Sequence, residues 1–274
     1  DSLNDLSQGT PWGLLNGEFY RTIDTPKLYL VKNFFYKLPE YILFTYLIFI
    51  FLIFKDQKFF KNHFKFVKTK LSYLLFIIVF PILMASLMAL KIHDGLRYFL
   101  FLIPYLSIIP AIAIYYLIYN IKLNIHKFYL ISILALFIYY LFNFFSLTPY
   151  HYTYLNILNG NFSDASKRFE NDYWGISLKE LVSKIEMSKH FNSNNYFKIA
   201  YCGINNDTIN YYLRRIENFK YIETPNDEDY DYIIMTNRVS GKDQTCFDSY
   251  KGKDILSVKR NGLILSRIRE NTGP

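Results

Sequence analysis

The chain has 274 residues and a formal net charge of +8 at pH 7, and 51% of its residues are apolar. The apolar residues concentrate between Leu38 and Leu147, whereas the rest of the sequence has an ordinary polar composition, which argues against a single soluble domain. The positive charge is mostly lysine, and the largest lysine cluster has a membrane explanation. Nothing therefore indicates a nucleic-acid-binding protein.

Residues 1–37 precede the first long apolar run, and the stretch "DTPKLYLVKNFFYKLPE", residues 24–40, leads from them into that run. Its apolar side chains fall near helical spacing: Leu28, Val31, Phe34, Phe35 and Leu38. This spacing favours a helix that lies along the outer membrane interface, and an extended segment that leads into the membrane is the alternative. The chain begins at Asp1 rather than Met, so we expect either a cleaved leader or the C-terminal piece of a longer protein.

Four apolar segments are long enough to cross a bilayer as helices, which takes about 20 residues each. They are residues 38–54, 71–90, 98–119 and 128–147. These runs carry almost no charge and the polar part of the chain is too short to cover them, which disfavours buried helices of a large soluble domain. Pro104 and Pro110 are expected to kink the third helix. We therefore predict an α-helical polytopic membrane region over residues 38–148.

Positive charge gathers in the loops on one side of these helices. The loop "KDQKFFKNHFKFVKTK" has six lysines and one aspartate, and the loop "NIKLNIHK" is also basic. The first 25 residues, by contrast, contain four acidic residues and only Arg21 as a basic residue. Because loops rich in Lys and Arg stay in the cytoplasm, both basic loops are predicted to be cytoplasmic. The protein is then expected in the bacterial inner (plasma) membrane, with "KIHDGLR" and its C-terminal domain on the outer face.

The sequence after the fourth span is typical of a linker, an amphipathic helix and a small α/β soluble domain. The linker and the helix, "GISLKELVSKIEMSKHF", cover residues 149–190, and the α/β domain covers residues 191–274. Strands are predicted in "FKIAYCG", "FKYIET", "YDYIIMTN", "DILSVKR" and "GLILSRIRE". A helix with an Asn/Asp cap is predicted in "NNDTINYYLRRI".

Two cysteines, Cys202 and Cys246, fall in the predicted α/β domain. An outer-face location permits a disulfide between them, although Cys202 could equally be a reduced, buried strand residue. The sequence has no CxxC, HExxH or Cys/His cluster, so no metal site is predicted. The stretch "YCGINND" lacks the glycine pattern of a dinucleotide-binding loop.

A charged stretch, "HDGLRYFLFLIP", opens the third span. His93 and Arg97 are four residues apart and share one face if the helix begins near Ile92. The planar guanidinium of Arg97 suits a phosphate at the level of the lipid headgroups. Arg97, aided by His93, is therefore the candidate for binding the phosphate of a lipid-linked substrate. The alternative is an interfacial arginine that reaches ordinary lipid headgroups.

Aromatic, acidic and amide side chains cluster directly after the fourth span. Aromatic rings stack on the C–H faces of sugars, and carboxylates and amides hydrogen-bond sugar hydroxyls. The candidates for binding a sugar or acceptor are Tyr150, Tyr152, Tyr154, Asn156, Glu170, Asp172, Tyr173 and Trp174. Two structural alternatives stay open. The tyrosines could form an interfacial aromatic belt, and Asp172 could satisfy backbone donors of a helix N-terminal turn above a packed Trp174.

Three stretches together resemble the C-terminal half of GT-C-type membrane glycosyltransferases, in the group of dolichyl-phosphate-mannose protein mannosyltransferases and bacterial lipid A aminoarabinose transferases. The matching residues of the first two are Thr25, Pro26, Tyr29, Leu30, Pro39 and Glu40, and Gly95, Leu96, Arg97, Tyr98, Phe101 and Pro104. Those of the third are Pro149, Tyr150, Tyr152, Tyr154, Asn156, Asp172, Tyr173, Trp174, Gly175, Ser177, Lys179 and Glu180. Thr148 and Tyr98 depart from the histidines that are usual or common there. The matches run from about residue 24 to 180.

The resemblance implies an inverting transfer of a sugar from a polyprenyl-phosphate donor to an acceptor on the outer face. In this family an acidic residue of the first outer loop acts on the acceptor hydroxyl, and cations near the membrane stabilise the phosphate leaving group. Nothing in this sequence matches that acidic loop, so no catalytic residue is assigned. We expect the chain to be a C-terminal fragment that is inactive alone.

The expected partners are membrane lipid, the polyprenyl-phosphate sugar as a co-substrate rather than a cofactor, and an acceptor glycolipid or protein. Two rival interpretations stay open. One is a non-catalytic membrane protein whose outer α/β domain binds a partner or a cell-wall component. The other is a different lipid-sugar enzyme, such as an oligosaccharide ligase.

Overall fold

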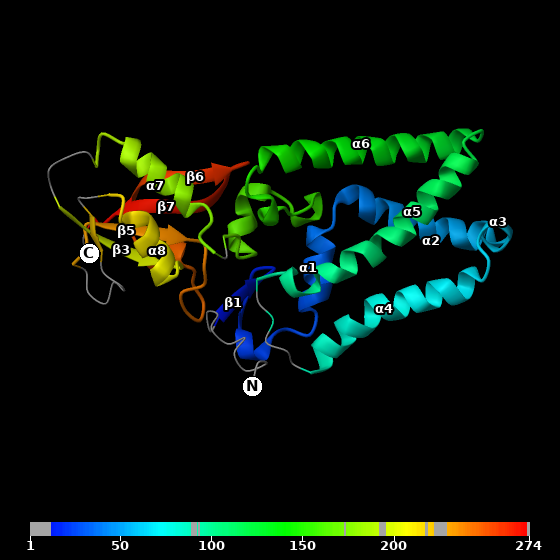
Figure 1. The fold of residues 1–274 in the computed structure, drawn as a ribbon, viewed down its shortest axis with the longest axis horizontal. Coiled ribbons are helices and arrows are strands. Elements are labelled where there is room, and N and C mark those ends of the chain that lie inside the picture. Colours follow the sequence, from blue (N-terminus) through cyan, green and yellow to red (C-terminus); the bar gives the residue numbers. More distant parts are fainter. Residues whose placement is uncertain are drawn as a thin grey trace.

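A bundle of long helices extends from a smaller sheet region in the computed structural model of the chain (Figure 1). The structure describes residues 12–88, 92, 94–172, 174–191, 196–216, 219–221 and 229–272. The turns that join α2 to α4 and α5 to α6 lie at the far end of the bundle, and the sheet lies at the opposite end. Both lysine-rich loops therefore occupy one end of the molecule.

The segment before the first predicted span is a helix, α1 (Tyr29–Lys37), and the extended alternative is wrong. Leu30 and Phe34 are buried, whereas Val31 and Phe35 are exposed, so the helix has apolar side chains on two faces. After Pro39 the chain turns by 104° into α2 (Glu40–Lys55). Proline has no backbone N–H to continue α1, which explains the position of this corner.

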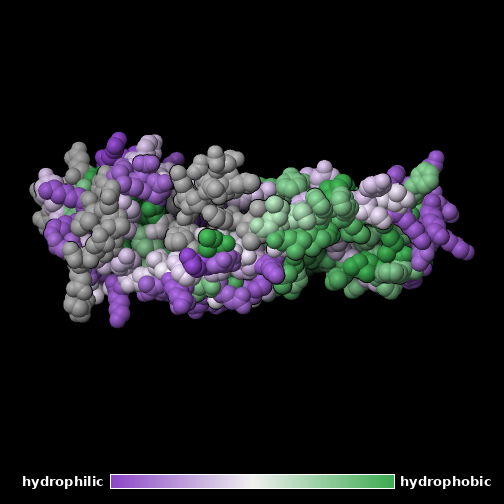
Figure 2. Space-filling view, turned by 90° about the horizontal axis from the view of Figure 1, so that it is seen from below, coloured by the Kyte–Doolittle hydropathy of each residue, from purple (hydrophilic) through white to green (hydrophobic). Residues whose placement is uncertain are grey.

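Three described helices are long and apolar enough to cross a membrane: α4 (Val67–Leu87), η3 with α5 (Arg97–Tyr119) and α6 (Asn124–Ser146). Only 6% of the most apolar window of α6 is buried inside the molecule. An apolar surface of this extent is unfavourable in water. Figure 2, which views the molecule from below and so from the side opposite α6, shows a broad hydrophobic band on that face of the bundle as well. The first predicted span, α2, has 16 residues and reaches only about 24 Å. It qualifies only when α1 and α2 count as one bent span.

The third predicted span has an irregular beginning. Residues Arg97–Leu102 form a 3-10 helix, η3, and α5 (Ile103–Tyr119) follows it. Pro104 stands in the first turn of α5, where a missing N–H removes no helical hydrogen bond. The predicted third span is thus broken just before Pro104, where η3 gives way to α5, and Pro110 lies inside α5.

The C-terminal region is the α/β unit that the sequence predicts, with strands in the order β4-β3-β5-β7-β6. β3 (Phe197–Cys202), β4 (Phe219–Tyr221) and β5 (Tyr232–Thr236) are parallel, whereas β6 (Lys253–Arg260) and β7 (Leu263–Glu270) form an antiparallel hairpin. The helices of this region are α7 (Leu178–Met187), α8 (Asn206–Leu213) and α9 (Cys246–Ser249). Residues 222–224 of the predicted second strand lie outside the described residues.

Several short elements were not predicted from the sequence. A hairpin of β1 (Trp12–Leu15) and β2 (Glu18–Arg21) precedes α1, and the short helix α3 (Gln57–His63) connects α2 to α4. The segments between the larger elements contain the 3-10 turns η2 (Thr22–Asp24), η4 (His151–Thr153), η5 (Ile157–Asn159) and η6 (Phe162–Lys167). These elements have too few residues for a periodic hydrophobic pattern.

Two large hydrophobic cores hold the molecule together, and a third, smaller cluster among the described residues lies between β3, β5 and α9. One runs without interruption from α1 and η3, through Leu102, to α7 and the sheet, where Leu181 and Ile199 are fully buried. The other lies inside the bundle, among α2, α3, α4, α5 and α6. The α/β unit is thus packed against the end of the bundle, and the residues between them are positioned by shared hydrophobic contacts.

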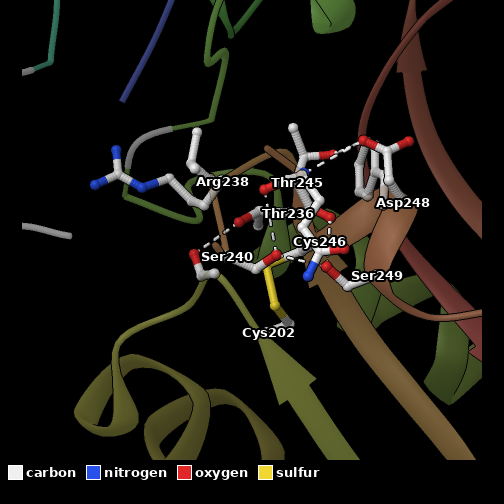
Figure 3. The surroundings of a disulfide bond; sticks show 12 residues. Cys202, Thr236, Arg238, Ser240, Thr245, Cys246, Asp248 and Ser249 are labelled. Carbon is white, nitrogen blue, oxygen red and sulfur yellow. Dashed lines mark hydrogen bonds between the residues drawn. A yellow bond between two sulfur atoms is a disulfide. The ribbon is translucent and has the colours of Figure 1, made fainter. Parts of the chain in front are cut away.

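Cys202 and Cys246 form a disulfide that ties the end of β3 to the start of α9 (Figure 3). The oxidised pair, rather than a reduced buried Cys202, is the alternative that the structure supports. The backbone N–H of Cys246 donates a hydrogen bond to the carbonyl of Arg238 at 2.8 Å. The disulfide therefore lies directly behind the loop that carries Arg238.

Candidate functional site

Arg97 lies at the surface where the bundle meets the α/β unit, at the start of η3. Its side chain is 40% exposed. The guanidinium lies over the ring of Tyr98 at 4.6 Å and over the ring of Trp174 at 5.1 Å. The Tyr98 hydroxyl accepts a hydrogen bond from Arg97 at 2.5 Å. Two aromatic rings thus hold the cation in place, and Arg97 and Trp174, which the sequence assigned to different groups, lie side by side.

Asp94 supports Arg97 from inside. The carboxylate is 3.5 Å from the Arg97 guanidinium and is itself only 5% exposed. Asp94 and Gly95 adopt the left-handed conformation, with φ of 58° and 69°. The Gly95 N–H donates to the Tyr29 hydroxyl at 2.8 Å. This tight turn directs the Asp94 side chain inward, and aspartate and glycine are among the residues that tolerate such a turn.

Arg238 joins this turn to the α/β unit. It follows β5, is buried, and donates a hydrogen bond to Asp94 Oδ1 at 2.9 Å. Its Nε lies 3.6 Å from Glu170, whose carboxylate also accepts the Val239 N–H. Burial raises the pKa of Glu170, while Arg238 and the Val239 N–H oppose that rise. Asp94 is therefore shared between a buried arginine at short range and the exposed Arg97 at longer range.

Lys37, the last residue of α1, adds a further cation. Burial lowers its pKa to about 8, and attraction to Asp94 opposes that change. Lys37, Arg97 and Arg238 thus all act on the Asp94 carboxylate, and Arg238 also lies close to Glu170. Of the two arginines, Arg238 is the closer to Asp94 and is buried, whereas Arg97 is the one exposed to a ligand.

A small polar cavity lies beneath this network. It offers about 10 Å³, which is room for about one water molecule. The side chains of Tyr20, Tyr29, Asn33, Asp94 and Glu170 line it. It is far too small for a sugar, so a larger ligand would have to bind outside it, where Arg97 and Trp174 are exposed.

Four predicted sugar-binding residues hold the polypeptide together in the structure. Tyr154 is buried and donates to Glu40 at 2.6 Å, and the Asn156 amide donates to the carbonyls of Phe35 and Leu38. The Tyr150 hydroxyl donates to Glu180, and the Tyr152 hydroxyl donates to Asp172. These contacts tie the segment after α6 to the corner between α1 and α2 and to α7.

Asp172 is fully buried and caps the turn before α7. Its carboxylate accepts the N–H groups of Ile176 and Ser177, the Ser177 hydroxyl and the Tyr152 hydroxyl. The capping alternative thus describes Asp172 correctly. Trp174 differs from that alternative, because it is 56% exposed rather than packed beneath the turn. Tyr173 and His93 lie outside the described residues.

Glu180 connects α7 to the other parts of the junction. It accepts hydrogen bonds from Tyr150 and from Arg260 on β6, and it pairs with Lys184. Partial burial would raise the pKa of Glu180, but the contacts with Arg260, Lys184 and Tyr150 outweigh that and lower it to about 2. Glu180, the last residue of the third matching stretch, therefore has a structural role in joining these elements.

Sequence reasoning missed Asp94, Arg238 and Lys37 as members of this site. Asp94 was visible inside "HDGLR", but its inward direction depends on the turn at Gly95. Arg238 had a usable signal, since a scarce arginine stands two residues after a mostly apolar strand. Among the described residues, no group of three or more His, Cys, Asp or Glu side chains could hold a metal ion. No family model, curated protein or solved structure matches the chain.

Proposed function

We propose that this chain belongs to an integral membrane glycosyltransferase that moves a sugar from a polyprenyl-phosphate donor to an acceptor on the outer face. Arg97 holds the donor phosphate, and the ring of Trp174 stacks on the sugar. The observation that carries this proposal is the pairing of an exposed, ring-clamped arginine with an exposed tryptophan at the end of an apolar bundle. A lipid phosphate that carries a sugar presents an anion and a C–H face next to each other.

The membrane arrangement follows from charge and length. α4, α5 and α6 cross the bilayer, α2 forms a fourth span, and α1 lies in the outer interface at 104° to α2. The lysine-rich end is cytoplasmic. The Arg97 site is then at the outer headgroup level, where a polyprenyl phosphate would present its charged group.

The chemistry that this chain contributes is stabilisation of the leaving group. The bond between the anomeric carbon and the phosphate oxygen breaks, the acceptor oxygen forms the new bond with inversion, and the departing phosphate gains negative charge. Arg97 offers guanidinium donors to that phosphate, and its positive charge stabilises the charge that develops there. The acceptor proton passes to a base, which the resemblance places in an acidic outer loop and to which we assign no residue here.

The hydrogen bonds of the predicted sugar-binding residues change the roles that we assign to them. Tyr150, Tyr154, Asn156 and Asp172 serve the framework, because each is buried and hydrogen-bonded to protein atoms. Trp174 remains the candidate for sugar contact among the described residues of the motif.

The test is binding of a long-chain polyprenyl phosphate to the full protein in its native membrane or in lipid nanodiscs. We expect Arg97→Ala to weaken binding by about tenfold or more, because a charged hydrogen bond contributes about 1.5–3 kcal/mol. The matched control is Arg215→Ala. Arg215 is also an exposed arginine over a tyrosine ring, but it lies in the α/β unit, just after α8. Equal binding by wild type and Arg97→Ala would contradict the proposal and favour the non-catalytic alternative.

A second measurement separates phosphate from sugar recognition. Trp174→Ala should weaken binding of a polyprenyl-phosphate sugar more than binding of the unglycosylated polyprenyl phosphate. Arg97→Ala should weaken both. If Trp174→Ala has the same effect on both ligands, the tryptophan does not contact the sugar.

A further inference from the structure

The other end of the bundle contains a corner that the proposed transfer reaction does not use. Asp56 caps α3 by accepting the Phe59 N–H at 3.1 Å, and it also accepts the Tyr116 hydroxyl. Phe59 and Phe60 of α3 are buried against the bundle. Phe66, in the left-handed conformation with φ of 57°, then turns the chain into α4. The corner between α2, α3 and α4 is therefore fixed by packing and by a capped turn.

A groove of about 290 Å³ lies in this corner. Five apolar side chains line it, together with one amide and two lysines. The lining residues are Ile53, Phe54, Gln57, Phe60, Lys61, Val67, Lys68 and Leu71. The groove thus combines a mostly apolar wall with two ammonium groups, Lys61 and Lys68, and both lysines are exposed.

These ammonium groups have no ion-pair partner among the residues that the structure describes. Residues 55–70 contain six lysines and one aspartate, which gives a net charge of +5 with histidine neutral. The single carboxylate, Asp56, accepts hydrogen bonds from Phe59 and Tyr116. Among ion pairs between described residues, none includes Lys61 or Lys68. An anion bound between them would relieve their mutual repulsion.

The position of the groove restricts the kind of anion. Figure 2 shows hydrophilic residues at the tip of the molecule next to the hydrophobic band. A ligand there must present charge toward the lysines and an apolar part toward Phe54 and Leu71. A free phosphate would leave the apolar wall exposed, and an uncharged lipid would leave the lysines without a partner.

We propose that this groove binds an anionic phospholipid, with the phosphodiester headgroup on Lys61 and Lys68 and the upper part of an acyl chain along the apolar wall. The inference rests on the proposed membrane insertion but not on sugar transfer. Its expected effect is to anchor the α2–α3–α4 corner at the headgroup level of the lysine-rich face, because anionic lipids attract basic segments by about 1 kcal/mol for each lysine near the surface.

The test adds phosphatidylglycerol to the full detergent-solubilised protein. Thermal unfolding then reports stabilisation by the lipid, and native mass spectrometry reports whether the lipid stays bound. The comparison ligands are phosphatidylethanolamine with the same acyl chains and inorganic phosphate. Phosphatidylglycerol should stabilise the wild type and remain bound. The double variant Lys61→Gln with Lys68→Gln should bind it roughly thirtyfold more weakly at low salt, which corresponds to two lysine contributions.

The matched control removes the same charge from the same loop. Lys58→Gln with Lys65→Gln changes two lysines that do not line the groove, and it should retain most of the affinity. Equal losses in both double variants would overturn the proposal, since attraction would then depend on net charge alone. Equal stabilisation by phosphatidylethanolamine would show that the groove does not recognise the anionic headgroup. Equal stabilisation by inorganic phosphate would show that the acyl chain does not contact the apolar wall.

The failure of this proposal is separable from failure of the proposed function. Arg97 lies at the opposite end of the bundle, so the Arg97→Ala protein should bind phosphatidylglycerol like the wild type. Loss of phosphatidylglycerol binding in Arg97→Ala would contradict an independent site in the groove.

Discussion

The two ends of the helical bundle carry charge in opposite ways. At the end next to the sheet, Asp94, Glu170 and Arg238 are buried, and both carboxylates lie within ion-pair distance of Arg238. At the other end, Lys61 and Lys68 are exposed and have no ion pair in the described part of the chain. Buried charge is tolerated only with a partner, whereas solvated charge needs none. The first end is thus built for fixed geometry, and the second is open to ligands from outside.

The sharpest test of this difference is removal of Arg238. Arg238→Met leaves Asp94 and Glu170 buried without their closest cation, so we expect the free energy of unfolding to fall by about 3–5 kcal/mol. Hydrogen exchange of the β5 and η3 amides in the detergent-solubilised protein would measure it. The double variant Arg238→Met with Glu170→Gln should lose less than the sum of the single losses. Strict additivity would show that the residues do not act as one network.

The disulfide behind the Arg238 loop provides the next largest effect. Cys202 and Cys246 are 44 residues apart, and closing such a loop stabilises the folded state by about 2–4 kcal/mol. We expect Cys202→Ser with Cys246→Ser to lower the unfolding free energy of the α/β unit by that amount. Phosphatidylglycerol binding at the other end should not change. A change there would show that the two ends are coupled, contrary to the comparison.

Lys37 makes the buried end sensitive to alkaline pH. Its folded pKa of about 8 lies below the ordinary value of 10.5, so between those values the unfolded chain binds more protons at this site. The contribution of Lys37 to stability therefore rises with pH from about 8 to 10.5. Lys37→Met lacks this titration, so its stability advantage over the wild type should shrink across that window. If the difference in unfolding free energy between Lys37→Met and the wild type stays constant from pH 7 to 10.5, the Lys37 ammonium group is solvated rather than buried. Loss of its charge above pH 8 should also weaken polyprenyl phosphate binding.

The smallest stability effect is expected at the exposed end. In the absence of added lipid, Lys61→Gln with Lys68→Gln should change the unfolding free energy by no more than about 0.5 kcal/mol, because neither ammonium group has an ion pair to lose within the described part of the chain. Thermal unfolding of the delipidated protein would measure this. A larger loss would mean that the lysines stabilise the corner itself, and it would weaken the contrast between the two ends.

Long elements were predictable and short ones were not. The long apolar runs predicted α4, α5 and α6, and short apolar runs such as "YDYIIMTN" predicted the sheet, because each element contains enough residues for a recognisable hydrophobic pattern. The hairpin of β1 and β2 and helix α3 are too short for that. The candidate site was predicted only in part. Arg97 and Trp174 were found individually, yet no periodicity relates residues that are 77 positions apart.

The sequence by itself determined that the chain has apolar helices, a basic pair of loops and a small α/β unit, since these follow from local hydrophobicity and charge. Only the tertiary structure decided what the polar residues of the motifs do. It buried Tyr154, Asn156 and Asp172 in hydrogen bonds with distant backbone and side chains, and it left Arg97 and Trp174 at the surface. The physical reason is that a polar side chain binds either protein or ligand, and that choice depends on long-range packing.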